Sequence, residues 1–212
     1  MEKLYVFFLA TPYRMGRMIR AVTRQKFNHV ALSFTPEGDE LYSFARTFRD
    51  LPLCGAFVKE TPERYLWEPE ETVVKVAAVP MTEAQKRKLV HTLRYFEEHA
   101  ADSVYNHFAA LLEPFGKTVQ LRGAYTCVQF VQGVFGHYFP ELGIDPVAHF
   151  TITDLEDALA PYVVYEGAYP GREEKCRYGY YTPHGRPEQV LRTARVAATL
   201  FDRLFEKGLK KL

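Results

Sequence analysis

The residue in this sequence best placed for covalent chemistry is Cys127, which follows Thr126 at the start of a run that reads as a helix. A threonine can cap the helix, so the thiol would lie beside unpaired backbone N–H groups and the positive end of the helix dipole. This setting favours thiolate, the reactive form of cysteine, and the same N–H groups could stabilise an oxyanion. The alternative is that Cys127 is a small buried apolar residue.

A nucleophilic cysteine needs a base within hydrogen-bonding reach. The seven histidines are His29, His91, His99, His107, His137, His149 and His184. His29 begins a strong predicted strand, and a side chain on a regular strand has a fixed position. His91 and His99 fall in an amphipathic helix and are expected at the surface. His29 is therefore the candidate base, and a purely structural histidine is the alternative.

The two motifs together resemble a known family. The stretch HVAL begins at His29, and YTCVQF spans residues 125–130. Their order, with a histidine strand before a cysteine helix, resembles the circularly permuted branch of the NlpC/P60 superfamily of papain-like cysteine peptidases. That branch includes amidase-like proteins and relatives of lecithin-retinol acyltransferase. The resemblance covers residues 27–46 and 103–139, and more loosely 1–140. It implies a papain-like fold with a Cys127–His29 pair.

The resemblance also implies a third, polar residue that orients the imidazole from the strand after the histidine strand. The usual offset falls on Leu41, which cannot serve. A turn two residues longer moves the position to Ser43, and an even shift keeps the same face of the strand. We therefore expect Ser43 as the third catalytic residue, with Glu40 and Arg46 as alternatives. Because Ser43 is neutral and short, a merely structural serine is the competing interpretation.

Tyr105, Tyr125 and Thr126 are the candidates for contacts with the substrate or the oxyanion. A tyrosine hydroxyl takes this role in some enzymes of the family, whereas the alternative for either tyrosine is a core aromatic residue. Cys54 and Cys176 open no evident helix and are expected to be non-catalytic. Three cysteines without a close pair argue against a disulfide framework and against a C-x-x-C zinc site. We expect no metal and no cofactor.

The elements that must position these residues follow one another in hairpin order. Apolar and β-branched runs predict strands over 4–10, 27–34, 41–46, 55–60, 72–80 and 162–167. Helical patterns cover 13–24, 82–100, 127–138, 152–159 and 187–209. Without an alternating βαβ rhythm, the pattern favours an α+β fold, with helices packed on a mostly antiparallel sheet. We expect one papain-like domain over 1–186.

Capping and amphipathic patterns define the helices. Thr82 with Gln85, and Thr153 with Glu156, read as capping boxes. The helix over 13–24 has apolar residues at helical spacing with arginines on the other face; these are Met15, Met18, Ile19 and Val22.

The C-terminal segment 187–212 is predicted to form an amphipathic helix packed on the domain or extending from it. Basic side chains decorate most of it, and membrane-surface contact or dimerisation are the alternatives to packing. Its expected apolar face comprises Val190, Ala194, Ala197, Phe201, Leu204 and Phe205.

Composition limits the function classes. The chain has 212 residues, 47% hydrophobic, with Lys+Arg 27 against Asp+Glu 26. This balance is typical of a folded globular protein and gives no reason to expect a nucleic-acid partner. The first apolar run is too short to span a bilayer and lacks a signal-peptide cleavage pattern, so we expect a cytoplasmic protein.

The expected function is a thiol hydrolase of the cysteine peptidase or amidase type, acting on a small peptide, amide or acyl substrate. The alternative is an acyltransferase, or a non-catalytic member that binds a small peptide or lipid-like ligand. The sequence does not define the oligomeric state.

Overall fold

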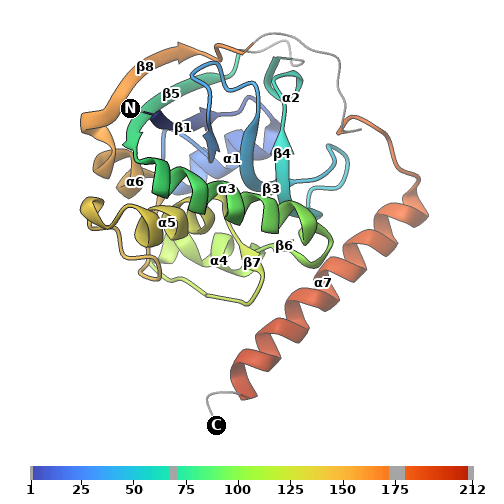
Figure 1. The fold of residues 1–212 in the computed structure, drawn as a ribbon. Helices are drawn as coiled ribbons and strands as arrows, with labels where there is room; N and C mark the ends of the chain where they lie inside the picture. The colour runs from blue at the N-terminus through green and yellow to red at the C-terminus, as the bar shows by residue number, and fades with distance from the viewer. Residues whose placement is uncertain (1, 67–70, 172–179, 210–212) are drawn as a thin grey trace.

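The computed structural model describes residues 2–66, 71–171 and 180–209. Its centre is a six-stranded antiparallel sheet with the strand order β4-β3-β2-β1-β5-β8. The strands are β1 (Glu2–Ala10), β2 (His29–Ser33), β3 (Leu41–Arg46), β4 (Gly55–Glu60), β5 (Val73–Met81) and β8 (Val163–Ala168). The predicted α+β class with an antiparallel sheet is therefore confirmed, and Figure 1 shows the sheet surrounded by helices.

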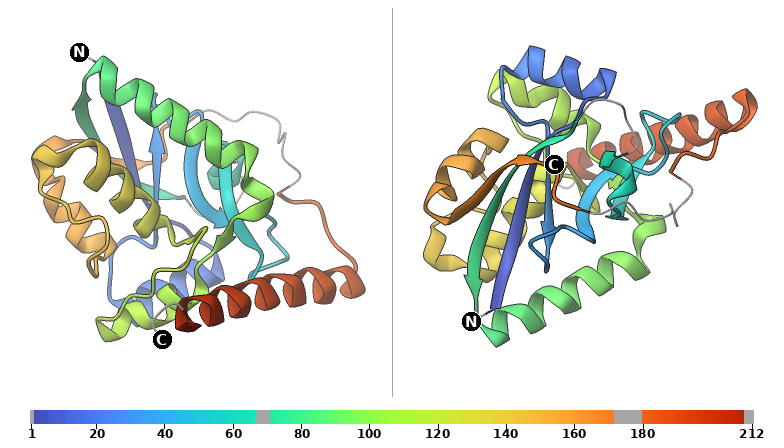
Figure 2. Two further views of the ribbon diagram at one scale, coloured as in Figure 1. Left: turned by 60° about the horizontal axis from the view of Figure 1, so that its bottom comes forward. Right: turned by 90° about the horizontal axis from the view of Figure 1, so that it is seen from above.

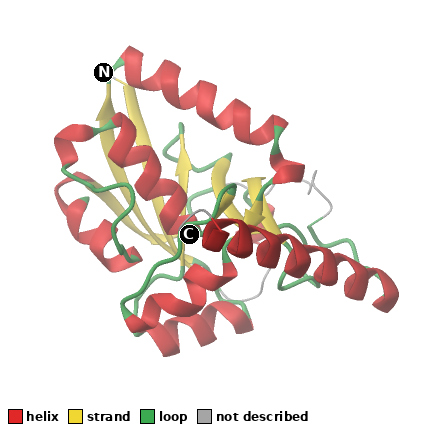
Figure 3. Ribbon diagram, turned by 90° about the horizontal axis from the view of Figure 1, so that it is seen from below, coloured by secondary structure: helices red, strands yellow, loops and turns green. Residues whose placement is uncertain are grey.

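Seven α-helices accompany the sheet within the described residues. They are α1 (Arg14–Thr23), α2 (Glu63–Leu66), α3 (Glu83–Glu98), α4 (His107–Leu112), α5 (Cys127–Tyr138), α6 (Ile152–Ala158) and α7 (Arg186–Leu209). Two short strands, β6 (Val104–Tyr105) and β7 (Ala124–Tyr125), pair in parallel beside α4 and α5. Figure 3 shows the helices in red and the strands in yellow.

The main core lies between one face of the sheet and the helices α3, α5 and α6. Helix α5 is buried along most of its length, because apolar residues recur around nearly all of it. Five rings, from Phe44, Phe57, Phe96, Tyr125 and Phe130, form a mutual cluster between β3, β4 and these helices. This packing holds α5 against β3 and against β2, the strand that begins with the candidate base His29.

The helix caps were predicted with mixed success. Thr82 and Gln85 form the expected capping box at α3. At α6 the prediction was wrong: the box is made by Thr151 and Asp154, two residues earlier than Thr153 and Glu156. Both threonines have an acidic residue three positions on, so the pattern alone could not choose between them.

Helix α7 packs by a face that only partly matches the one expected. Val196, Leu200 and Leu204 contact the small cluster around Val104, Leu121 and Ala124, and of these three Leu204 belongs to the predicted face. By contrast Val190 and Phe205 of the predicted face are exposed, and Phe201, also largely exposed, has its ring centroid 5.5 Å from that of Phe108. Figure 2 shows α7 lying along one side of the domain and continuing past it. Among the described residues, no helix is both long and apolar enough to cross a bilayer.

Candidate active site

Cys127 is the first residue of α5, and its side chain is buried. Thr126 caps the helix: its Oγ1 accepts a hydrogen bond from the N–H of Gln129 at 3.1 Å, and the Gln129 side chain accepts one from the N–H of Thr126 at 3.0 Å. The predicted helix start is therefore confirmed. Thr126 acts on the backbone, and its contacts give it a positioning role at this helix end.

His29 is the first residue of β2 and is also buried. Its Nε2 lies 2.8 Å from Oε1 of Glu60. The Cys127 thiol lies close enough to the same imidazole to raise its pKa. The start of β2 and the start of α5, far apart in the sequence, therefore bring these two side chains near each other.

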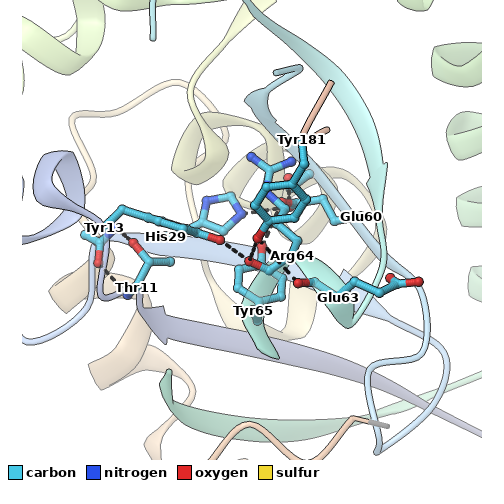
Figure 4. A network of polar contacts seen from close by, with 10 residues as sticks. Thr11, Tyr13, His29, Glu60, Glu63, Arg64, Tyr65 and Tyr181 are labelled. Carbon is cyan, nitrogen blue, oxygen red and sulfur yellow. Dashed lines mark hydrogen bonds and ion pairs between the residues drawn. The ribbon is translucent and has the colours of Figure 1, made fainter. Parts of the chain in front are cut away.

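The carboxylate of Glu60 is fully buried at the end of β4 and is surrounded by donors. Besides His29, the Ser43 hydroxyl donates to Oε1. On the other oxygen, Oε2 accepts from the Tyr65 hydroxyl at 2.7 Å and from Arg64 Nε at 2.8 Å. Figure 4 shows His29, Arg64 and Tyr65 gathered around Glu60. A buried carboxylate with this many donors is stable in its charged form.

The charges of Glu60 and His29 reinforce each other. Burial alone would raise the pKa of Glu60, but Arg64 and His29 lower it to about 2. Burial alone would lower the pKa of His29, but the carboxylate of Glu60 and the Cys127 thiol raise it to about 9. At neutral pH the imidazole is therefore held as a cation between a carboxylate and a thiol. An adjacent cation favours ionisation of a cysteine.

An outer layer of side chains holds Arg64 in place. The Tyr13 hydroxyl donates to the backbone carbonyl of Arg64, and the ring of Tyr180 lies 4.2 Å from its guanidinium carbon. Burial by itself would lower the pKa of Arg64, but the charge of Glu60 is the strongest influence that raises it. The pairing of Arg64 with Glu60 thus fixes the orientation of the carboxylate that binds His29.

The structure gives His29 a different partner from the expected Ser43. The Ser43 hydroxyl is bonded to Glu60, so the serine acts on the carboxylate and not on the imidazole. Because β3 lies between β2 and β4, the Glu60 side chain crosses β3 to reach His29, and it passes at Ser43. A small residue at this position leaves room for that crossing. Ser43 is a support of the site, and Glu60 holds the position expected of the third residue.

The two alternatives to Ser43 lie elsewhere. Glu40 is paired with Lys59 at 2.6 Å and accepts from the Tyr42 hydroxyl at 3.1 Å. Arg46 lies over the ring of Tyr13 and donates to the carbonyl of Arg49. Both residues have partners of their own away from the imidazole.

Of the two candidate tyrosines, Tyr105 lies at the thiol. Burial raises the pKa of its hydroxyl well above the ordinary value, and the nearby Cys127 contributes to this shift. A neutral hydroxyl at this place could donate to an oxyanion formed on a substrate carbonyl. Tyr125 instead packs its ring on Phe44 and Phe96. It belongs to the core, as the alternative interpretation held.

Cys54 and two further histidines of the described residues have partners other than His29 and Cys127. Cys54 is buried at the start of β4, and burial raises its pKa. Cys176 falls outside the described residues. His107 is bonded to the carbonyl of Leu53, and His184 to Asp50. Within the parts of the chain that the structure describes, no three His, Cys, Asp or Glu side chains are grouped as metal ligands.

Sequence reasoning missed Glu60, although it predicted the strand that ends there. The signal was present: an acidic residue closes a largely apolar strand, and Arg64 follows four residues later. A carboxylate at such a position needs a buried partner. The family pattern places the third residue on β3, the strand next to His29, whereas Glu60 lies on β4, the strand beyond it.

The arrangement is a buried acid–base–thiol array drawn from β4, β2 and α5. Comparisons of the chain with protein-family models, with curated proteins and with solved structures find no match. The chemistry must therefore be argued from the geometry of these residues.

Proposed function

We propose that this protein is a papain-like thiol enzyme that acts on an amide or ester bond through an acyl-enzyme. The observation that carries the proposal is the His29 imidazole, held between the Cys127 thiol and the buried carboxylate of Glu60. Nucleophile, base and orienting group are the three parts that this chemistry needs. The resemblance to the permuted NlpC/P60 branch implies the same class, with peptidase, amidase or acyltransferase as the reaction.

In the proposed reaction, Cys127 acts as a thiolate beside the protonated His29, and its sulfur attacks the carbonyl carbon of the substrate. The carbonyl electrons move to oxygen, where the Tyr105 hydroxyl and the N–H of Cys127 stabilise the negative charge. As the carbonyl reforms, the leaving amine or alcohol takes a proton from His29. Water, or another acceptor, then gives a proton to His29 and attacks the thioester, which releases Cys127.

Glu60 supports the enzyme proposal over a non-catalytic binding protein. That alternative was motivated by a weak orienting residue, because Leu41 and Ser43 offered no charge. A carboxylate 2.8 Å from the imidazole supplies one. Such a group fixes the ring orientation and stabilises the imidazolium that forms during the reaction.

The test is the rate of cysteine alkylation by iodoacetamide against pH, read for each cysteine by mass spectrometry. We expect Cys127 to react rapidly at pH 6, where an ordinary thiol with a pKa of about 8.5 is almost fully protonated. A His29→Ala variant should lose this reactivity, because its thiolate has no neighbouring cation. Cys54 is a matched control, since it is 6% exposed and Cys127 is 4% exposed.

If Cys127 reacts no faster than Cys54 at pH 6, or if His29→Ala leaves its rate unchanged, the proposed nucleophile is wrong. If the pair behaves as expected, a screen of amides, esters and thioesters identifies the acyl group and the acceptor.

A further inference from the structure

Helix α1 turns its apolar side chains toward solvent. Met18 is 59% exposed and Val22 is 64% exposed, with Ile19 exposed beside them. The helix contacts the domain through Gly16, where a Cβ atom would lie only 2.3 Å from Oγ1 of Thr11. The close approach at Gly16 determines which side of the helix faces inward.

A second exposed apolar group lies next to α1. Leu111 at the end of α4 and Phe115 in the following turn are 69% and 73% exposed. The segments are joined directly, since Gln25 donates to the carboxylate of Glu113 at 3.0 Å. Figures 2 and 3 show α1 and α4 side by side. We call the surface formed by Met18, Ile19, Val22, Leu111 and Phe115 the α1–α4 patch.

Basic residues border the α1–α4 patch. Helix α1 contains three arginines and no acidic residue, and Arg24 follows it directly. Lys117 is exposed just beyond Phe115. The acidic residue between the two helices, Glu113, is half-buried, bonded to Gln25, and has its pKa raised by burial. The patch is therefore apolar at its centre and positive at its border.

Helix α7 provides an instructive contrast. It also exposes large apolar side chains, among them Val190 and Phe205. These are interleaved with the acidic residues Glu188, Asp202 and Glu206, and Glu188 is paired with Arg192 at 2.8 Å. These carboxylates would weaken the attraction to an anionic surface, although α7 as a whole carries five basic residues against three acidic ones. Helix α1 differs because it contains no acidic residue at all.

We infer that the α1–α4 patch binds an anionic membrane surface, with its apolar side chains inserted among lipid headgroups and its arginines on lipid phosphates. A basic amphipathic helix lying in the plane of the interface binds in this way. The positive border selects an anionic bilayer over a neutral one, and salt weakens that part of the attraction.

The α1–α4 patch is connected to the candidate active site at both of its helices. From α1, Arg20 donates to the side chain of Asn28 at 2.7 Å, and Asn28 precedes the base His29. On the other side, Asn106 caps α4 and directly follows Tyr105, which touches Cys127. A bilayer bound at this patch would lie at the end of the molecule where base and nucleophile meet. Binding itself does not depend on the proposed catalysis.

The experiment is co-sedimentation of the full chain with vesicles of phosphatidylcholine alone, or of phosphatidylcholine with phosphatidylglycerol. We expect binding to the vesicles that contain phosphatidylglycerol and a decrease at high salt. Val22→Asp should weaken binding about tenfold, because it places a carboxylate in the inserted face. Val190→Asp is the matched control, since it makes the same change at an equally exposed valine of α7, and it should leave binding unchanged. Circular dichroism verifies that both variants are folded.

Three results would overturn the inference. The first is failure of the wild-type chain to bind either vesicle. The second is an equal loss in Val22→Asp and Val190→Asp, which would indicate a general effect of charge. The third is a dimer in light scattering that Val22→Asp dissociates, without vesicle binding, which would assign the patch to a second copy of this chain. Cys127 alkylation is measured on the same samples, so failure of binding and failure of the catalytic proposal are distinguished.

Discussion

Replacing Glu60 by glutamine is the most direct test of how the site is charged. The substitution keeps the side-chain shape and removes the charge of Glu60, which together with the Cys127 thiol raises the pKa of His29 to about 9. Burial, the largest influence on His29, lowers that pKa, so we expect the variant imidazole to titrate at a clearly lower pH than its parent. The ordinary pKa is about 6.5, so at roughly 1.4 kcal/mol for each pH unit Glu60 and Cys127 together stabilise the imidazolium by about 3 kcal/mol, and the variant loses the part due to Glu60.

The assay is an NMR titration of the His29 ring, carried out in a Cys127→Ala background because the thiol also raises the pKa. Glu63→Gln is the matched control. Glu63 is as deeply buried as Glu60 and lies three residues further on, but its carboxylate has no hydrogen-bond partner within the described residues. We expect the control to leave the His29 titration unchanged.

The Glu60→Gln variant should also be less stable. It leaves the guanidinium of Arg64 buried without its carboxylate, and removal of one partner of a buried ion pair costs about 3–5 kcal/mol. Circular dichroism must therefore establish that the variant is folded before the titration. If folded Glu60→Gln protein titrates at the same pH as its parent, the charge of Glu60 does not control the imidazole and the reasoning is refuted.

Three further predictions follow from the same contacts. Ser43→Ala should lower the free energy of unfolding in urea by about 1–3 kcal/mol, because it removes a hydrogen bond to a buried carboxylate. An altered His29 titration in this variant would contradict our assignment of Ser43 as a residue that supports Glu60. Folded His29 keeps its proton up to about pH 9, whereas the unfolded imidazole loses it near about 6.5. The stability advantage of wild type over His29→Gln should therefore be full below about pH 6.5 and disappear by about pH 9, and urea midpoints that differ equally at pH 6 and 9.5 would count against it. Thr126→Ala should cost about 1 kcal/mol in thermal unfolding through loss of the α5 cap, and no loss would mean that the cap is not needed.

Local sequence signals were sufficient for most of the framework. The bounds of β3 and β4 agree with the predicted strands 41–46 and 55–60, and α5 begins at Cys127 as the capping pattern indicated. Each of these segments combines a clear period with a turn or cap residue at its end. Such features are determined by neighbouring residues and can be seen without knowledge of tertiary contacts.

The carboxylate partner of His29 could not be predicted from such local signals. Whether Glu60 reaches His29 depends on the order of three strands and on the small size of Ser43 between them. The same limit explains which faces of α1 and α7 pack on the domain, since the apolar side of α1 is largely exposed and only part of the predicted face of α7 is covered. Gly16 decides the orientation of α1, and Leu200 that of α7. Each of these outcomes depends on which surface the helix meets, which periodicity does not specify.

The order of the candidate catalytic residues along the chain has a consequence for biosynthesis. Strands β1 to β4 form a meander whose contacts all close between residues 2 and 60, so the pairing of His29 with Glu60 requires only the first part of the chain. Cys127 leaves the ribosome later than both. Until α5 docks on β2 and β3, its thiol lacks the neighbouring imidazolium. In the nascent chain the Cys127 thiol is therefore separate from the imidazole, and the two side chains come together only after the α5 segment has been synthesised and packed.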